Sequence, residues 1–263
     1  MIFDCHTHIF PEGLVDRAMV SLSAGYGVEP VGRATADGLL AHMDACGVDK
    51  ALAVSVATKP SQVQSINDWL LSLGQERLVP FGAMHPYYED METEIQRLLD
   101  AGVKGIKLQP YFQGYRLDDP RTLAMFECIG DRLIVLLHGG NEIIPLPEVQ
   151  PTPERVRNLH RRFPQVRLIV AHLGASGLWD DVEKYLVGED LVFDASYVFD
   201  ICSDEQVGRI IRNHGPERIL WGSDFPWQPQ SQGIAGVNRL PFTEEQKQGI
   251  LSGNLLRLLG MKS

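Results

Sequence analysis

Five of the eight histidines stand at or just beyond the end of a short apolar run. They are His6, His8, His85, His138 and His172. Asp224 follows a similar run, Ile219-Leu220-Trp221. Neutral imidazole and carboxylate groups suit zinc and similar divalent ions, and a catalytic site leaves one position open for water or substrate. These residue types predict a metal-dependent site if the fold brings them together.

His6 and His8 are two residues apart in Asp4-Cys5-His6-Thr7-His8. In a strand the side chains alternate between faces, so both imidazoles point the same way and can share one ion. An isolated pair of this kind is more often structural. The further histidines at the ends of other apolar runs favour a metal site.

His138, His172 and Asp224 occupy equivalent positions after three further apolar runs. His138 precedes Gly139-Gly140, where a buried strand opens into a loop of close approach, and we interpret it as the third ligand. Asp224 alone would be interpreted as a helix cap or a solvated charge. Beside these histidines we predict that it is the fourth ligand.

Lys107 interrupts the apolar run Gly105-Ile106-Lys107-Leu108, where an unpaired ammonium group would be costly to bury. One interpretation is that it reaches the rim of the fold or pairs with a carboxylate. The other is that it is carbamylated and bridges two metal ions. The sequence leaves both open.

Eight short, β-branched runs separate stretches of helical length. They are Ile2 to Cys5, Lys50 to Val56, Leu78 to Met84, Val103 to Leu108, Leu133 to Leu137, Arg167 to Ala171, Leu191 to Ala195 and Ile219 to Trp221. Most lack the alternation of half-exposed strands, which is typical of parallel strands buried on both faces.

Helix signals fill the intervals between these runs. Thr152 with Pro153 predicts a helix start, and that helix should run to Phe163. Thr243 with Gln246 predicts a capping box and a closing helix that ends at Gly260. The alternation predicts one α/β domain over residues 1–263, a (β/α)8 TIM barrel, whose carboxyl rim would gather the histidines. An open doubly wound sheet is less favoured, because no glycine-rich phosphate loop follows the first run.

The composition limits the class of partner. The 263 residues carry a formal net charge of −10, which argues against nucleic acid or an anionic membrane surface and favours a small-molecule substrate. No segment reaches the roughly 20 apolar residues of a membrane span, so we expect a cytoplasmic protein. The four cysteines form no CxxC pair and are expected to be reduced and buried.

Several motifs together resemble the amidohydrolase superfamily, in the amidohydrolase-related branch that includes aminocarboxymuconate semialdehyde decarboxylase and several lactone or amide hydrolases. They are Asp4 to Pro11, Gly105 to Leu108, Ala171 to Gly174, Trp221 to Pro226 and Gly253 to Leu258. The resemblance covers essentially the whole chain and implies a barrel of amidohydrolase type. It implies that His6, His8, His138 and Asp224 bind the metal, that Asp224 is also the general base, and that His172 binds a second metal or orients and protonates the substrate.

The resemblance implies a branch of mixed chemistry, in which decarboxylases usually lack a lysine on the fourth strand. Lys107 therefore favours a metal-dependent hydrolase, in which zinc-activated water cleaves an amide or lactone of a small, carboxylated substrate. One zinc ion is expected, or two if Lys107 is carbamylated. The alternatives are a metal-dependent non-oxidative decarboxylase and, from another class, a catalytically inactive barrel that acts as a binding protein.

Loop residues are weaker candidates for substrate contacts. Arg116 could clamp a substrate carboxylate or pair at the surface with Asp118 or Asp119. Tyr111, Asn141 and Trp227 are candidate pocket walls. The sequence leaves open the role of His85, the substrate, the metal number and whether the chain forms a homo-oligomer.

Overall fold

The computed structural model describes residues 1–142 and 146–262. The chain divides into two compact units. Unit 1 consists of Met1–Ala53, Gln75–Val79 and Phe193–Ser263, and unit 2 consists of Val54–Gly74 and Pro80–Val192. Each unit contains hydrogen-bonded strands, with helices between them along the chain.

Unit 1 holds, wholly or mainly, the first and last strands of the chain. Its elements are β1 (Phe3–His8), α1 (Glu12–Tyr26), α2 (Ala36–Cys46), β2 (Lys50–Val54), β3 (Leu78–Pro80), β8 (Val192–Asp194), α9 (Asp204–His214), η2 (Pro216–Arg218), β9 (Ile219–Leu220), α10 (Gln230–Arg239), α11 (Glu244–Gln248), the π-helical turn η3 (Gly249–Gly253) and α12 (Asn254–Leu259).

Backbone hydrogen bonds place β1 in the middle of unit 1. β1, β2 and β3 are hydrogen-bonded in that order, and β8 pairs in parallel with β9. The segment that follows β9 continues onto β1, because Cys5 N donates to Trp221 O (3.0 Å) and His8 N donates to Phe225 O (2.7 Å). The carboxyl end of β1 therefore lies beside the loop that carries Asp224.

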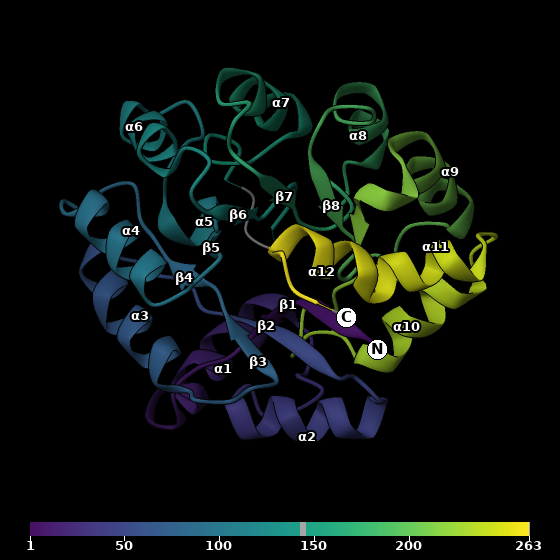
Figure 1. The fold of residues 1–263 in the computed structure, drawn as a ribbon, viewed down its shortest axis with the longest axis horizontal. Coiled ribbons are helices and arrows are strands. Elements are labelled where there is room, and N and C mark those ends of the chain that lie inside the picture. Colours follow the sequence, from purple (N-terminus) through teal and green to yellow (C-terminus); the bar gives the residue numbers. More distant parts are fainter. Residues whose placement is uncertain (143–145, 263) are drawn as a thin grey trace. The chain divides into compact units, whose positions relative to one another are not determined.

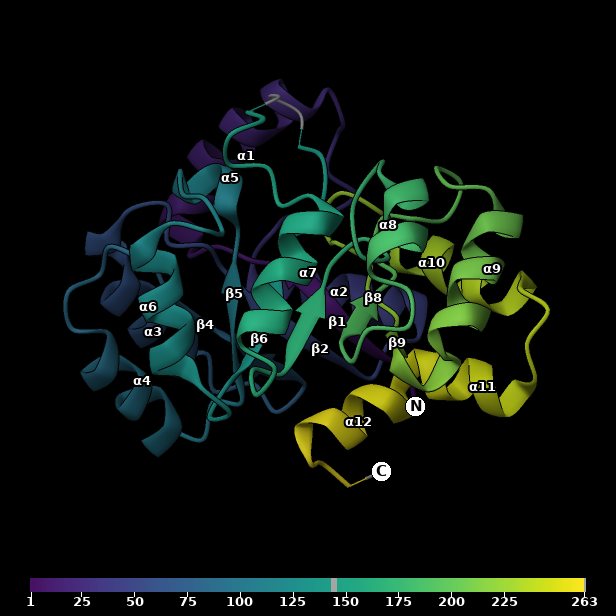
Figure 2. The same ribbon diagram turned by 90° about the horizontal axis from the view of Figure 1, so that it is seen from above.

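Unit 2 consists of four parallel strands and their helices. Its elements are η1 (Pro60–Gln62), α3 (Val63–Ser72), β4 (Gly82–Ala83), α4 (Met91–Asp100), β5 (Gly105–Leu108), α5 (Pro110–Gln113), α6 (Pro120–Ile129), β6 (Ile134–Leu137), α7 (Pro153–Arg162), β7 (Leu168–Val170) and α8 (Trp179–Tyr185). Figure 1 shows α3, α4, α6 and α7 along the outer side of the β4 to β7 ladder, and Figure 2 shows α7 beside α8.

The strands of unit 2 are buried as their sequence predicts. Every residue of β5, β6 and β7 is buried, including both faces of the Ile134–Leu137 strand. β4, β5, β6 and β7 pair in parallel, with Lys107 opposite Leu136. The carboxyl ends of these parallel strands therefore lie along the same edge of the sheet.

The predicted helix boundaries agree closely with the structure. Thr152 caps α7 by accepting a hydrogen bond from Arg155 N, and Thr243 with Gln246 forms the capping box. The closing helix differs from the single helix we expected, because it is divided into α11, the π-helical turn and α12 before it ends at Gly260. Each of the eight apolar runs overlaps a strand, but β1 extends beyond the first run to His8 and the third run is divided into β3 and β4.

Among the described residues no disulfide joins the four cysteines. Cys5 and Cys202 are buried, whereas Cys46 and Cys128 are partly exposed, so our expectation of burial is wrong for the latter two. Both lie on amphipathic helices, α2 and α6, where a cysteine can occupy the border of the buried face.

Candidate metal centre and active site

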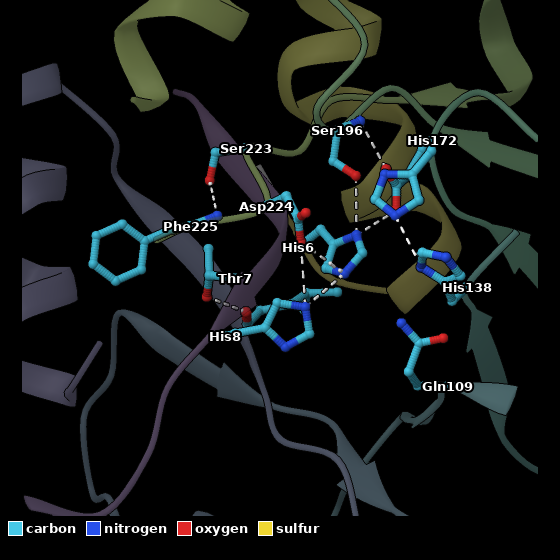
Figure 3. A network of polar contacts seen from close by, with 12 residues as sticks. His6, Thr7, His8, Gln109, His138, His172, Ser196, Ser223, Asp224 and Phe225 are labelled. Carbon is cyan, nitrogen blue, oxygen red and sulfur yellow. Dashed lines mark hydrogen bonds and ion pairs between the residues drawn. The ribbon is translucent and has the colours of Figure 1, made fainter. Parts of the chain in front are cut away.

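The alternation of β1 turns two imidazoles to one side. His6 Nε2 and His8 Nε2 are 3.2 Å apart, and the intervening Thr7 turns the other way and donates to Leu52 O (2.7 Å) (Figure 3). His6 is fully buried and the His8 side chain is 17% exposed. Both nitrogens of the pair can therefore point at one ion.

Asp224 completes a cluster of three donors within unit 1. Its Oδ1 lies 3.2 Å from His8 Nε2 and 3.5 Å from His6 Nε2, and its own N–H donates to His6 O (2.9 Å). The three ligand atoms lie within 4.8 Å of one another. Two imidazoles and a carboxylate at this spacing fit a divalent metal ion.

The backbone at Asp224 is held in an unusual conformation, with φ of 61°. A non-glycine residue in the left-handed region costs about 1 kcal/mol or more and persists only where neighbouring contacts impose it. The bond from Asp224 N to His6 O is one such contact. The observed strain supports a functional role for this residue.

The far side of the His6 ring is fixed by groups from β8 and its loop. His6 Nδ1 lies 2.9 Å from Asp194 Oδ2 and 3.0 Å from Ser196 Oγ. A carboxylate accepts only, so Nδ1 carries the proton and Nε2 keeps its lone pair for a ligand. We did not predict Asp194 from the sequence, although an aspartate within the apolar run Leu191 to Ala195 is a signal that could have indicated it.

Asp4 ties β1 to the segment that carries Asp224. It is fully buried and accepts from His6 N (3.1 Å), Ser223 N (2.9 Å) and Gln230 Nε2 (2.8 Å). Burial raises the pKa of Asp4 to about 6, against the lowering effect of these hydrogen bonds. Asp4 therefore joins the two halves of the donor cluster by accepting backbone hydrogen bonds from His6 and Ser223.

Tyr197 is a second residue that sequence reasoning missed. It follows Ser196, has φ of 51° and is partly exposed. Burial, and then the charge of Asp224, raises the pKa of its phenol. This hydroxyl stays protonated at neutral pH, so it can donate a hydrogen bond near the donor cluster.

In unit 2, His138 and His172 lie against each other. His138 Nδ1 is 3.0 Å from His172 Nε2, and each residue is 5% exposed (Figure 3). His172 also has a left-handed backbone, with φ of 61°, and its carbonyl accepts from Trp179 Nε1 (3.1 Å). The pair can share a proton through the contacting nitrogens.

The loop after His138 needs its two glycines. Ser176 N donates to Gly139 O (2.8 Å), and a Cβ at Gly140 would overlap the backbone of Ser176. Gly140 also has φ of 88°. A side chain at this position would displace the loop that follows His172.

A buried polar pair lies beside His138. Glu142 Oε1 is 3.5 Å from His138 Nε2 and accepts a hydrogen bond from Gln109 Nε2 (2.8 Å). The Glu142 side chain is 7% exposed and Gln109 is 4% exposed. We predicted neither residue from the sequence, because a glutamine after a strand and a glutamate in a loop carry no distinctive pattern.

Burial in unit 2 bears on the two residues whose roles the sequence left open, Lys107 and His85. Lys107 is 1% exposed, so its ammonium does not lie in solvent, whereas pairing with a carboxylate and carbamylation both stay predictions. His85 accepts from Tyr87 N (3.2 Å), and burial lowers its pKa despite a backbone hydrogen bond with Gln113. The imidazole of His85 is therefore neutral, and its hydrogen bond to Tyr87 N holds the loop that follows it.

The loop candidates are placed as follows. Arg116 is exposed and pairs with Asp118 (2.6 Å), which is the surface pairing that the sequence left open. Tyr111 is buried in unit 2, Trp227 is buried in unit 1, and Asn141 is exposed and accepts from Gln150 Nε2 (2.5 Å). A contact between Arg116 and substrate stays a prediction. Tyr111, Asn141 and Trp227 likewise remain predicted pocket walls.

A family model described as amidohydrolase matches residues 3–261. This chain belongs to the amidohydrolase family. No curated protein sequence matches this amidohydrolase. Membership of this family supports the prediction that the chain is an enzyme. It also confirms the family resemblance from which we predicted the metal ligands.

Solved structures show the same fold. This chain is similar to 5-carboxyvanillate decarboxylase from Sphingomonas paucimobilis, with a TM-score of 0.73, 16% identity and 99% of each chain covered. It is also similar to dihydroxybenzoic acid decarboxylase from Polaromonas sp. JS666, whose structure has bound manganese and the inhibitor 2-nitroresorcinol. The TM-score is 0.74 and the identity 17%, with 98% of this chain and 96% of that chain covered. An uncharacterized TIM-barrel protein from Bordetella bronchiseptica matches at 0.76 and 17%, covering 98% of each chain.

These similarities confirm the predicted fold class, a (β/α)8 TIM barrel of amidohydrolase type. Backbone hydrogen bonds among the described residues do not by themselves close the strands into a barrel. The prediction that residues 1–263 form a single domain stays a prediction.

Our main functional prediction is wrong. Amide or lactone hydrolysis is contradicted by the comparison with solved structures, in which decarboxylases of 5-carboxyvanillate and dihydroxybenzoate recur. The physical reason is that the ligand set is shared across the family, whereas loop residues choose the reaction. We had favoured hydrolysis because of one residue, the buried Lys107.

Proposed function

We propose that this amidohydrolase is a metal-dependent decarboxylase that removes carbon dioxide, without oxidation, from a small aromatic or unsaturated acid. The observation that carries the proposal is the donor cluster of His6, His8 and Asp224, with Asp194 fixing His6 from behind. The decarboxylases among the similar structures support the choice of reaction.

A divalent ion held by His6, His8 and Asp224 would supply positive charge that polarises the substrate. We predict from the family resemblance that His138 is a further ligand. Manganese in similar structures supports a divalent ion, and zinc remains our prediction from the donor types. Elemental analysis giving one or two ions per chain would decide whether carbamylated Lys107 has a part.

The reaction requires a proton at a defined place. When the bond between the ring carbon and the carboxylate breaks, carbon dioxide leaves and the electron pair stays on carbon, which must take a proton. We propose that Asp224 holds that proton, with His172 as the second candidate. Positioned proton transfer of this kind contributes about 10²- to 10⁴-fold in rate.

The proposal is tested by product analysis. Protein loaded with Mn²⁺ or Zn²⁺ is incubated with hydroxylated benzoic acids, and released carbon dioxide and the shortened product are quantified. We expect one carbon dioxide per product, and none after chelation. Hydrolysis of a lactone or amide panel without carbon dioxide release would overturn the proposal, and no turnover with any metal would revive the binding-protein alternative.

Replacing Asp224 tests its role directly. We expect Asp224→Asn to lower kcat by about 10²-fold or more while the circular dichroism spectrum is unchanged, because the amide cannot deliver the proton. Asp37→Asn, at an exposed aspartate in the first turn of α2, is the matched control. Wild-type turnover in Asp224→Asn would exclude Asp224 as the proton donor.

A further inference from the structure

The Gln109 and Glu142 pair of unit 2 has an amide whose orientation is fixed by its partner. Glu142 is four residues after His138, and its carboxylate can only accept hydrogen bonds. The Gln109 atom that lies 2.8 Å from Glu142 Oε1 must therefore be the NH2 group. The amide oxygen of Gln109 consequently points away from Glu142.

That oxygen, Gln109 Oε1, is buried and has no hydrogen-bond partner among the described residues. The rest of Gln109 is held in place. Its N–H donates to Gln113 Oε1 (2.7 Å), and Gln113 Nε2 in turn donates to Met84 O (2.7 Å) and Ala57 O (3.0 Å). A buried acceptor on a fixed backbone requires a donor from elsewhere.

The two side chains together select the chemistry of a ligand. Gln109 Oε1 and the Glu142 carboxylate are both acceptors, and Glu142 adds negative charge. A substrate carboxylate would be repelled here, whereas a hydroxyl or amino group would be accepted. We propose that Gln109 and Glu142 bind a hydrogen-bond donor, a hydroxyl or amino group, on the part of the substrate away from its carboxylate. This inference rests on the proposed function for the acid end of the substrate.

The test compares ligands that differ only in this donor. Binding of hydroxybenzoates and of the matching methoxybenzoates, which lack the O–H, is measured by calorimetry on the metal-loaded protein. We expect wild type to prefer one hydroxybenzoate over its methyl ether by about tenfold or more, since a buried acceptor rejects a ligand that leaves it unpaired. Equal affinity within about twofold for every pair would overturn the inference.

Two variants separate the amide from its fixing partner. Gln109→Leu removes the acceptor and should reduce the preference to within about twofold. Glu142→Gln lets the Gln109 amide turn over and offer its NH2 to an ether oxygen, so the preference should also fall about tenfold. Glu142→Gln carries the test alone if Gln109→Leu does not fold. Preference that persists in a folded Gln109→Leu variant would refute the proposal.

The controls distinguish this inference from the proposed function. Gln96→Leu makes the same chemical change at an exposed glutamine of α4 and should leave the preference unchanged. Metal content should equal that of wild type in both variants, because neither residue is assigned as a ligand. If no acid releases carbon dioxide but the calorimetric preference and its loss are seen, the decarboxylase assignment fails and the donor-binding pair stands.

Discussion

At the scale of single residues, the metal centre depends on the tautomer of His6. Asp194 and Ser196 both contact Nδ1, and this leaves Nε2 toward His8 and Asp224. A histidine held by a carboxylate is oriented before the metal arrives and is a more basic ligand. The affinity of the site should therefore be sensitive to a residue that does not contact the ion.

We expect Asp194→Asn to weaken binding of Mn²⁺ by about 10- to 100-fold, because an amide can present its NH2 to Nδ1 and favour the wrong tautomer. Competition with a chelator of known affinity measures the change. Ser196→Ala removes the other contact and should have a smaller effect. Unchanged affinity in Asp194→Asn would show that Asp194 does not orient His6.

At the scale of elements, helix α10 approaches the loop after β8 at a glycine. A Cβ at Gly236 would overlap the ring of Phe199, which is fully buried, so no other residue fits without a shift. α10 also packs against α2. This close approach fixes where the loop containing Ser196 and Tyr197 runs.

Gly236→Ala should lower the free energy of unfolding by about 1–3 kcal/mol, as overpacking does. Gly208→Ala in α9 is the matched control, because its Cβ would meet nothing within 4 Å and alanine favours the helix by about 0.5–1 kcal/mol. Urea denaturation of both variants measures the difference. A stable Gly236→Ala protein would mean that Phe199 can move aside freely.

A second element contact links α4 to α6. Glu92 accepts from both Arg132 Nη1 (2.6 Å) and Nη2 (2.7 Å) and from Cys128 Sγ (3.2 Å). The Arg132 guanidinium, then the thiol, lowers the pKa of Glu92 to about 2. Its ordinary value is 4.5, so the unfolded chain takes up the proton first on acidification.

The stabilisation from Glu92 should be complete above about pH 4.5 and disappear as the pH falls toward about 2. We expect wild type and Glu92→Gln to differ in urea midpoint near neutral pH and to converge on acidification. High salt should reduce the difference, since the pair is exposed. The double variant with Arg132→Gln is the control, and a difference that grows in acid would contradict the assignment.

At the scale of the whole molecule, the residues that we predicted as metal ligands fall in both units. His6, His8 and Asp224 belong to unit 1, and His138 and His172 belong to unit 2. No helix among residues 1–142 and 146–262 is long and apolar enough to cross a membrane. The cytoplasmic location and the homo-oligomer stay predictions.

Metal loading should stabilise the protein and show which residues hold the ion. At about a hundredfold excess over Kd, Mn²⁺ should raise the free energy of unfolding by about 2.7 kcal/mol. Hydrogen exchange should slow in β1 and in residues 221–227, and also at His138 if it is a ligand. Protection absent from β1 would contradict the centre, and protection confined to unit 1 would exclude His138.

The strands, the helix caps and the chemical types of the residues at the strand ends could all be predicted from the order of residues alone. The apolar runs identify buried parallel strands because burial on both faces leaves no polar alternation. The spacing of His6 and His8 required only the period of two of a strand, so their shared face was predictable. The order of motifs was enough to recognise the family.

Contacts between residues that are distant in the sequence could be learned only from the folded chain. Asp194 reaches His6 across 188 positions of sequence, and no local pattern encodes that distance. Gln109 and Glu142 form a pair through the positions of two separate strand ends, and Arg116 is held by Asp118 at the surface. Side-chain partners follow from packing in three dimensions, which a linear periodicity does not contain, and the reaction was misjudged for the same reason.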